Sequence, residues 1–130
     1  MKKLLTLLFS ILILPLSVIA SDVYYCSEDG VTGFDREKKL QITNFQEIRF
    51  KIMIDFENES VISNDILFFE KLKTKCIFHD DNNALYCINN IGMVFSINKT
   101  NLFFVRSTMF NKREGNQDSL LISHGTCEKF

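Results

Sequence analysis

The chain has 130 residues, 46% of them hydrophobic, and its 15 basic and 16 acidic residues leave a formal net charge of −1. No long run of like charge occurs, which argues against a surface that attracts the phosphate backbone of a nucleic acid. The length is that of one domain with its own hydrophobic core.

The first 20 residues have the pattern of an export signal. Lys2 and Lys3 give a positively charged start, residues 4–16 form a largely apolar run, and the segment ends at Ala20. Such an order of charge, apolar run and small residue is typical of a cleavable signal peptide. We predict cleavage after Ala20, which leaves a single domain over residues 21–130 in the periplasm or outside the cell.

Removal of this segment changes the formal charge of the chain and removes its one candidate for a membrane-spanning helix. The basic residues fall to 13 (15 minus Lys2 and Lys3) against 16 acidic ones, a formal charge of −3. The apolar stretch contains Pro15 and is shorter than the roughly 20 residues that a spanning helix needs. We therefore expect no stable membrane span after cleavage, and an uncleaved N-terminal anchor is the alternative.

The clearest predicted element covers residues 45–57, where apolar and polar side chains alternate. The apolar parity consists of Ile48, Phe50, Ile52, Ile54 and Phe56. The other parity carries Arg49, Lys51, Asp55 and Glu57, with Met53 as the exception. This period of two predicts a half-buried strand. We interpret the four charged residues as a solvated strand face rather than as a pair of catalytic carboxylates.

Two hairpins are predicted after this strand. Residues 76–79 and 84–88 flank a polar turn, and residues 93–97 and 102–110 flank a second one. A polar loop over residues 112–118 and a last strand over residues 120–123 are expected to follow. About eight short strands without a convincing amphipathic helix predict an all-β domain, either a small antiparallel β-barrel or a sandwich.

Four cysteines in an exported domain predict two disulfides. Cys76 and Cys87 are equidistant from the centre of the first hairpin turn, so they are expected to lie opposite each other within bridging distance. The remaining pair, Cys26 and Cys127, would tie the first strand to the last and close a barrel. Four cysteines allow three connectivities, and the turn symmetry favours this one. The longer loop predicts that Cys127→Ser lowers stability more than Cys87→Ser.

Other uses of the cysteines have little support. A redox role would need a Cys-x-x-Cys pair or a lone reactive thiol, and neither is present. The gaps of 50, 11 and 40 positions between successive cysteines do not have the paired short spacings of a zinc site.

Three short motifs suggest chemistry. His79-Asp80-Asp81 is a candidate for weak divalent-cation binding, although Asp and Asn are also favoured in turns for local hydrogen bonding. Ser123-His124 suggests a hydrolase pair, but neighbouring strand residues point to opposite faces. Gly30-Val31-Thr32-Gly33 lacks the strand-to-helix context of a phosphate-binding loop. We therefore predict a protein that is not an enzyme, with no catalytic, cofactor-binding or metal-binding residue.

Two phenylalanine pairs are explained most simply by packing, with a binding function as the alternative. Phe68-Phe69 and Phe103-Phe104 place rings on both faces of a strand. One face belongs to the core. The other predicts a covered second layer, a ligand cavity or an exposed patch for a partner.

Three cysteine-containing stretches carry a family resemblance: Tyr24-Tyr25-Cys26, Leu85-Tyr86-Cys87-Ile88-Asn89-Asn90 and Gly125-Thr126-Cys127-Glu128-Lys129-Phe130. In these the chain resembles small exported bacterial β-rich proteins of unassigned function. More loosely, it is similar to the periplasmic C-type lysozyme inhibitors, which implies a small β-barrel. The Ser-Gly-x-x-Tyr loop of that family is absent here, so the resemblance assigns no functional residue.

Three classes of function remain open. The first is a non-catalytic exported module that binds a small apolar ligand in the barrel mouth. The second is a protein-interaction or inhibitor module with an exposed aromatic face, and the third is an enzyme. The first two differ in where the phenylalanines outside the core point: inward around a void, or outward as a patch.

Overall fold

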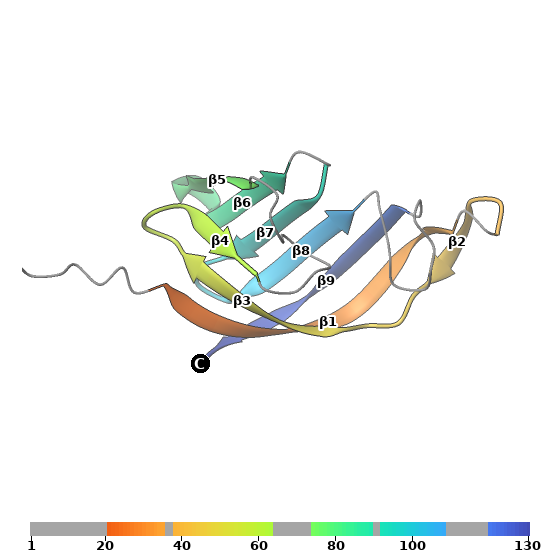
Figure 1. The fold of residues 1–130 in the computed structure, drawn as a ribbon, viewed down its shortest axis with the longest axis horizontal. Coiled ribbons are helices and arrows are strands. Elements are labelled where there is room, and N and C mark those ends of the chain that lie inside the picture. Colours follow the sequence, from red (N-terminus) through yellow and green to blue (C-terminus); the bar gives the residue numbers. More distant parts are fainter. Residues whose placement is uncertain (1–20, 36–37, 64–73, 90–91, 109–119) are drawn as a thin grey trace, which may run out of the picture.

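The structure is a computed structural model that describes residues 21–35, 38–63, 74–89, 92–108 and 120–130 (Figure 1). The strands in these residues are β1 (Asp22–Asp35), β2 (Gln41–Asn44), β3 (Arg49–Asp55), β4 (Ser60–Ile62), β5 (Thr74–His79), β6 (Ala84–Asn89), β7 (Val94–Asn98), β8 (Phe103–Thr108) and β9 (Leu120–Lys129). The predicted signal over residues 1–20, the Phe68-Phe69 pair and the predicted loop over residues 112–118 lie outside the described residues.

The strands form one antiparallel sheet that curls into a nearly closed barrel. Their order is β4-β3-β1-β9-β8-β7-β6-β5, and β2 pairs with the second half of β1. Figure 1 shows β1, β3 and β9 on one side of the barrel and β5, β6 and β7 on the other. We call these two sides the lower wall and the upper wall. The all-β prediction is confirmed, and of the two predicted architectures the barrel is the one formed.

The first and last strands pair as predicted, but the barrel closes elsewhere. β1 is hydrogen-bonded on both edges, to β9 on one side and to β3 and β2 on the other. The seam lies between β4 and β5, and no strand ladder joins these two in the described residues. A side chain bridges the seam instead, since the Phe78 amide donates to the Glu59 carboxylate at 2.9 Å. This carboxylate satisfies a backbone donor that a sheet edge would leave unpaired.

Both predicted disulfides are confirmed. Cys26–Cys127 joins β1 to β9 in the lower wall, and Cys76–Cys87 joins β5 to β6 in the upper wall. Each pair is directly opposed in its ladder, with the two Cα atoms 4.0 Å apart. The turn symmetry therefore identified the right partners.

The first hairpin has the predicted register. Ile77 lies opposite Tyr86 and Phe78 opposite Leu85. A single 3-10 turn over Asp80–Asn82 reverses the chain, and Asn83 follows in the left-handed conformation (φ 50°), which asparagine adopts more readily than most residues. The second hairpin, β7 to β8, also forms where it was predicted.

Two strand boundaries differ from the prediction by four residues or more. β3 begins at Arg49 rather than at residue 45, because the preceding residues run beside β1 with only isolated backbone hydrogen bonds. The Phe45 amide donates to the Val31 carbonyl, and the Glu28 amide to the Ile48 carbonyl, both at 3.0 Å. β9 runs through Gly125 to Lys129 instead of ending at residue 123. Gly125 keeps β9 against β1, since a Cβ there would stand 2.0 Å from the Ser27 carbonyl oxygen. Glycine thus permits the close approach that lengthens the strand.

The apolar core fills one end of the barrel. Its buried members come from both walls: Tyr24, Cys26, Phe50, Ile52, Ile54, Val61, Leu85, Cys87, Phe95, Ile97, Phe104 and Cys127. Phe104 packs edge-on against Phe50 and is stacked with Phe95. The alternation predicted for β3 is confirmed, because Phe50, Ile52 and Ile54 all point into this core.

Candidate functional site

Beyond the apolar core, the barrel interior contains a buried ion pair. The Arg106 guanidinium on β8 contacts the Glu28 carboxylate on β1, and the two side chains are 4% and 0% exposed. Arg106 Nε also donates to Ser123 Oγ at 3.1 Å, and the guanidinium lies 5.8 Å from the centre of the Phe50 ring. Glu28 accepts a second bond from the Ile48 amide at 2.9 Å. Each charge therefore has several partners, as a buried ion requires.

This pair was not among the predicted sites, although the strand pattern contains a signal for it. Glu28 has the same parity as the inward-facing Tyr24 and Cys26, and Arg106 has that of Phe104. Two opposite charges at core positions of different strands indicate a buried pair. Because both side chains are buried, the arrangement joins β8, β9 and β1 inside the barrel and does not form an open polar cleft.

Asp55 is a correction to the predicted solvated face of β3. Asp55 is only 9% exposed, and its carboxylate caps the turn after the strand. It accepts from the Asn58 side chain at 2.7 Å and from the Asn58 and Glu57 amides at 2.9 and 3.0 Å. The Asn58 side chain, followed by the two amides, lowers the pKa of Asp55. Arg49, Lys51 and Glu57 are exposed as predicted.

The other predicted motifs separate in space. Ser123 points into the barrel at 2% exposure, whereas His124 is exposed and stacked on Phe103, so these neighbours do not form a hydrolase pair. His79 and Asp80 are exposed in the hairpin turn, where the His79 ring meets Tyr86 edge-on. Within the described ranges no group of three or more His, Cys, Asp and Glu is placed to hold a metal ion.

Phe103 and Phe104 point to opposite faces of β8, as predicted. Phe104 is fully buried and Phe103 is 41% exposed on the outside. Phe103 is one of many apolar residues with this outward orientation. We define the apolar face as the exposed outward side chains of β5 to β9: Ile77, Tyr86, Ile88, Val94, Phe103, Val105 and Ile122.

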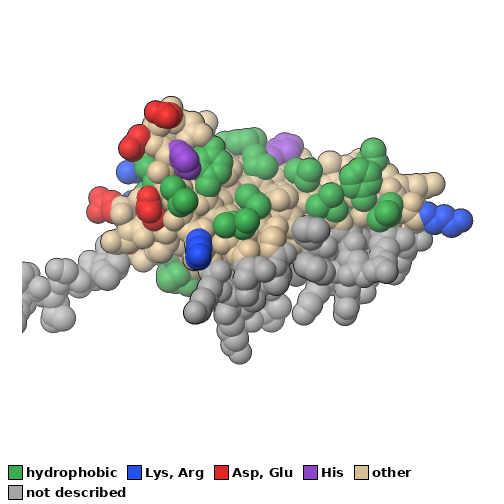
Figure 2. All heavy atoms as spheres, turned by 90° about the horizontal axis from the view of Figure 1, so that it is seen from above, with side chains coloured by type: hydrophobic (Ala, Val, Ile, Leu, Met, Phe, Trp, Pro, Cys, Tyr) green, Lys and Arg blue, Asp and Glu red, His purple; other side chains and the backbone are tan. Residues whose placement is uncertain are grey.

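The strand registers place most of the apolar face in two neighbouring rows, which Ser96 on β7 and Ser107 on β8 interrupt. Ile77 lies directly opposite Tyr86, and Ile88 lies directly opposite Val94. Val105 and His124 are opposed on β8 and β9, next to Ile122. Figure 2 shows hydrophobic side chains distributed along this side of the molecule, with acidic side chains gathered at one end. The turn with Asp80 and Asp81 follows β5 at one border of the apolar face.

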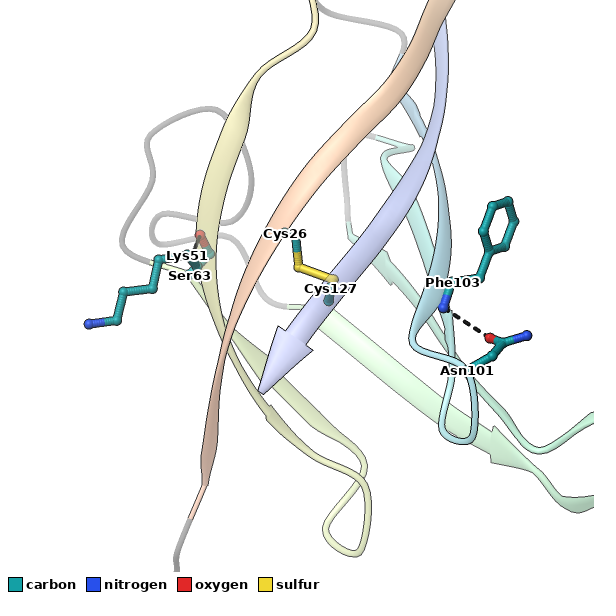
Figure 3. The surroundings of a disulfide bond; sticks show 6 residues. All are labelled: Cys26, Lys51, Ser63, Asn101, Phe103 and Cys127. Carbon is teal, nitrogen blue, oxygen red and sulfur yellow. Dashed lines mark hydrogen bonds between the residues drawn. A yellow bond between two sulfur atoms is a disulfide. The ribbon is translucent and has the colours of Figure 1, made fainter. Parts of the chain in front are cut away.

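A second surface feature lies on the outside of the lower wall. A groove of ≈ 580 Å³ is lined by Tyr25, Cys26, Ser27, Arg49, Phe50, Lys51, Thr126 and Glu128. Lys51 projects outward from β3, and the Cys26–Cys127 disulfide joins β1, which pairs with β3, to β9 (Figure 3). Arg49 and Lys51 were predicted only as part of a solvated strand face. The positions of Thr126 and Glu128 beside β1 depend on pairing across the whole length of the chain.

Comparison with protein-family models, curated proteins and solved structures gave no significant match. The likeness to C-type lysozyme inhibitors therefore stays a prediction. Two disulfides are typical of an oxidising, extracellular-type environment. In the part of the chain that the structure describes, no helix has the length and apolar character to cross a membrane.

Proposed function

We propose that this chain is a non-catalytic exported binding module that docks a partner protein through the apolar face. The observation that carries the proposal is the gathering of exposed apolar side chains from five consecutive strands onto one side of the barrel. Large contiguous apolar patches are uncommon on soluble monomers and mark interaction sites.

The orientation of the aromatic rings favours this function over a small apolar ligand in the barrel mouth. Leu85, Phe95 and Phe104 fill the interior at 0% exposure, and the ion pair of Arg106 occupies the space beyond them. Phe103 and Tyr86, by contrast, point outward. A pocket that holds an apolar ligand is lined mainly by hydrophobic side chains around a void. The small-ligand hypothesis stays a prediction, and the exposed rings support the partner hypothesis.

The borders of the apolar face indicate the chemistry of the partner. Asp80 and Asp81 are exposed in the turn at one border. Lys75 on β5, directly opposite Ile88, adds a positive charge to the same edge. A complementary partner therefore places a basic side chain against the turn and an acidic one near Lys75, because rim charges select and steer partners. Exposed rings such as Tyr86 are the residue type that most often anchors an interface.

A photocrosslinking experiment tests the proposal in the native host. A benzoyl-phenylalanine is placed at Ile88 or Val105 on the apolar face, and at Leu40 as the control. Leu40 is an equally exposed apolar residue (59%, against 51% for Ile88) in the turn between β1 and β2. We expect one discrete heterologous adduct from both apolar-face positions and none from Leu40. An adduct from Leu40 as well, no adduct, or an adduct of twice the chain mass would overturn the proposal.

The crosslinked partner is then purified and titrated against variants of the chain. Ile88→Lys should weaken binding at least about tenfold, the loss expected when one anchor residue of an interface is removed. Leu40→Lys should leave the affinity unchanged. Both variants should keep the wild-type melting temperature, because surface substitutions change stability by no more than about 0.5 kcal/mol. Equal affinities for the two variants would show that the adduct formed by proximity alone.

A further inference from the structure

The groove on the lower wall is built from three neighbouring strands and adjoins the apolar face at Phe103. On β1, Tyr25 and Ser27 point outward, with Lys51 and Arg49 directly opposite them on β3. On the other side of β1, Glu128 and Thr126 on β9 complete the same two rows. The inward-facing Cys26 and Phe50 contribute to its lining from below.

The hollow arises from side-chain size. Ser27 and Thr126 are short, whereas Arg49, Lys51 and Tyr25 are long and stand around them. Phe103 on β8 lies opposite Thr126 on β9, so its aromatic ring borders the groove on the side away from β3. The short hydroxyl side chains thus form a polar trough between longer ones.

Among the described residues, the two cations of the groove have no acidic partner. Lys129 on β9, by contrast, is paired with Asp22 at 2.7 Å, and this hydrogen bond raises the pKa of Lys129. No described residue forms an ion pair with Arg49 or Lys51, and the Lys51 ammonium lies 5.9 Å from the centre of the Tyr25 ring. Both cations are therefore available to an external anion.

The spacing of the cations suggests what kind of anion they meet. Arg49 and Lys51 are two residues apart on one face of β3, so their Cα atoms are about 7 Å apart. An extended peptide also places every second side chain on one face, at the same repeat. Two carboxylates at alternate positions of such a peptide match the two cations, and a guanidinium binds a carboxylate through two parallel hydrogen bonds.

The contacts of Tyr25 argue against a sugar ring as the ligand. Lys51 lies over the Tyr25 ring, and Phe130 meets it at a centroid distance of 5.7 Å. A ring flanked by these neighbours is less accessible for face-to-face stacking. The hydroxyls of Ser27 and Thr126 are suited to hydrogen bonding along a peptide backbone.

We infer that the groove binds an extended acidic peptide segment, with carboxylates at alternate positions on Arg49 and Lys51. Glu128 stands on the opposite side of Tyr25 and repels the same ligand. The proposal therefore predicts two opposite effects: removing a cation should weaken binding, and removing Glu128 should strengthen it.

Calorimetric titration with an acetylated and amidated Gly-Glu-Gly-Glu-Gly peptide tests this inference. The Gly-Gln-Gly-Gln-Gly peptide is the matched probe without charge. We expect the glutamate peptide alone to bind, and to bind more weakly as salt is raised. Arg49→Gln and Lys51→Gln should each reduce the affinity about fivefold, the upper range for a solvent-exposed charge pair. Glu128→Gln should raise it by about twofold.

Lys75→Gln is the control variant, since Lys75 is an exposed cation on β5 in the opposite wall. Its affinity for the glutamate peptide should equal that of the wild type. Equal losses for Lys75→Gln and Arg49→Gln would mean non-specific charge attraction and would overturn the inference. Equal binding of the two peptides, or no binding of the glutamate peptide at millimolar concentration, would also overturn it. These results test the groove alone, because the substitutions at Arg49, Lys51 and Glu128 leave every residue of the apolar face unchanged.

Discussion

The upper and lower walls are both antiparallel sheet with one cross-strand disulfide, yet they differ in how they are stabilised and in what they present outside. In the upper wall, Cys76–Cys87 joins the two strands of one hairpin, with a sequence separation of 11. In the lower wall, Cys26–Cys127 joins the first strand to the last, with a separation of 101. The apolar face covers the exterior of the upper wall and continues over β8 to Ile122 on β9, whereas the charged groove lies on the exterior of the lower wall only.

This difference shows that interior stability and exterior chemistry are separable on the same strands. Period-two alternation assigns one set of residues to the core and leaves the other set free. On β8, for example, Phe104 belongs to the core whereas Phe103 faces outward. The two walls thus share an interior, while their exteriors differ in chemistry.

The largest expected effect is the loss of the long-range disulfide. Replacing Cys26 and Cys127 by alanine should lower the free energy of unfolding by about 4.7 kcal/mol, and replacing Cys76 and Cys87 by about 3 kcal/mol. The longer loop restricts the unfolded chain more, so its removal frees more conformations. Urea denaturation of both double variants measures the difference. Equal losses in the two walls would contradict the loop-entropy explanation.

The buried ion pair is a second feature that distinguishes the lower wall, because it joins β8 to β1. Arg106→Met leaves the Glu28 carboxylate without its charged partner and should destabilise the fold by about 3–5 kcal/mol. The double variant Arg106→Met/Glu28→Leu should lose less than Arg106→Met alone, since no unpaired charge remains. Chemical denaturation of the single and double variants provides the measurement. Additive losses would show that the two side chains act independently.

The smallest effect concerns the capped turn at the end of β3. The Asn58 side chain and the two amides hold the pKa of Asp55 below its usual value. Stability from this group is therefore complete above the unfolded pKa of about 3.9, and is lost as the pH falls through the lower folded value. Asp55→Ala should be less stable than the wild type at pH 7, and the difference should shrink below about pH 4. Thermal melts at pH 7, 4 and 2.5 test this, and a constant difference would argue against the carboxylate as the cause.

Local pattern predicted much of the fold. Alternation along residues 48–56 identified the inward face of β3, and the symmetric placement of Cys76 and Cys87 about a polar turn gave both the hairpin register and the pairing. Elimination then gave Cys26–Cys127. These features were accessible because each depends on residues close together in the chain, or on a count of what remains.

Tertiary structure alone decided the surfaces and the polar interior. Glu28 and Arg106 are 78 positions apart and meet only because β9 lies between β1 and β8. Thr126 reaches the groove, and Ile122 the apolar face, through ladders that join opposite ends of the chain. A local period tells which side of a strand a residue faces, and it carries no information on which distant strand will lie beside it. The sequence by itself therefore determined the strands and their faces, and long-range pairing determined which side chains share a surface.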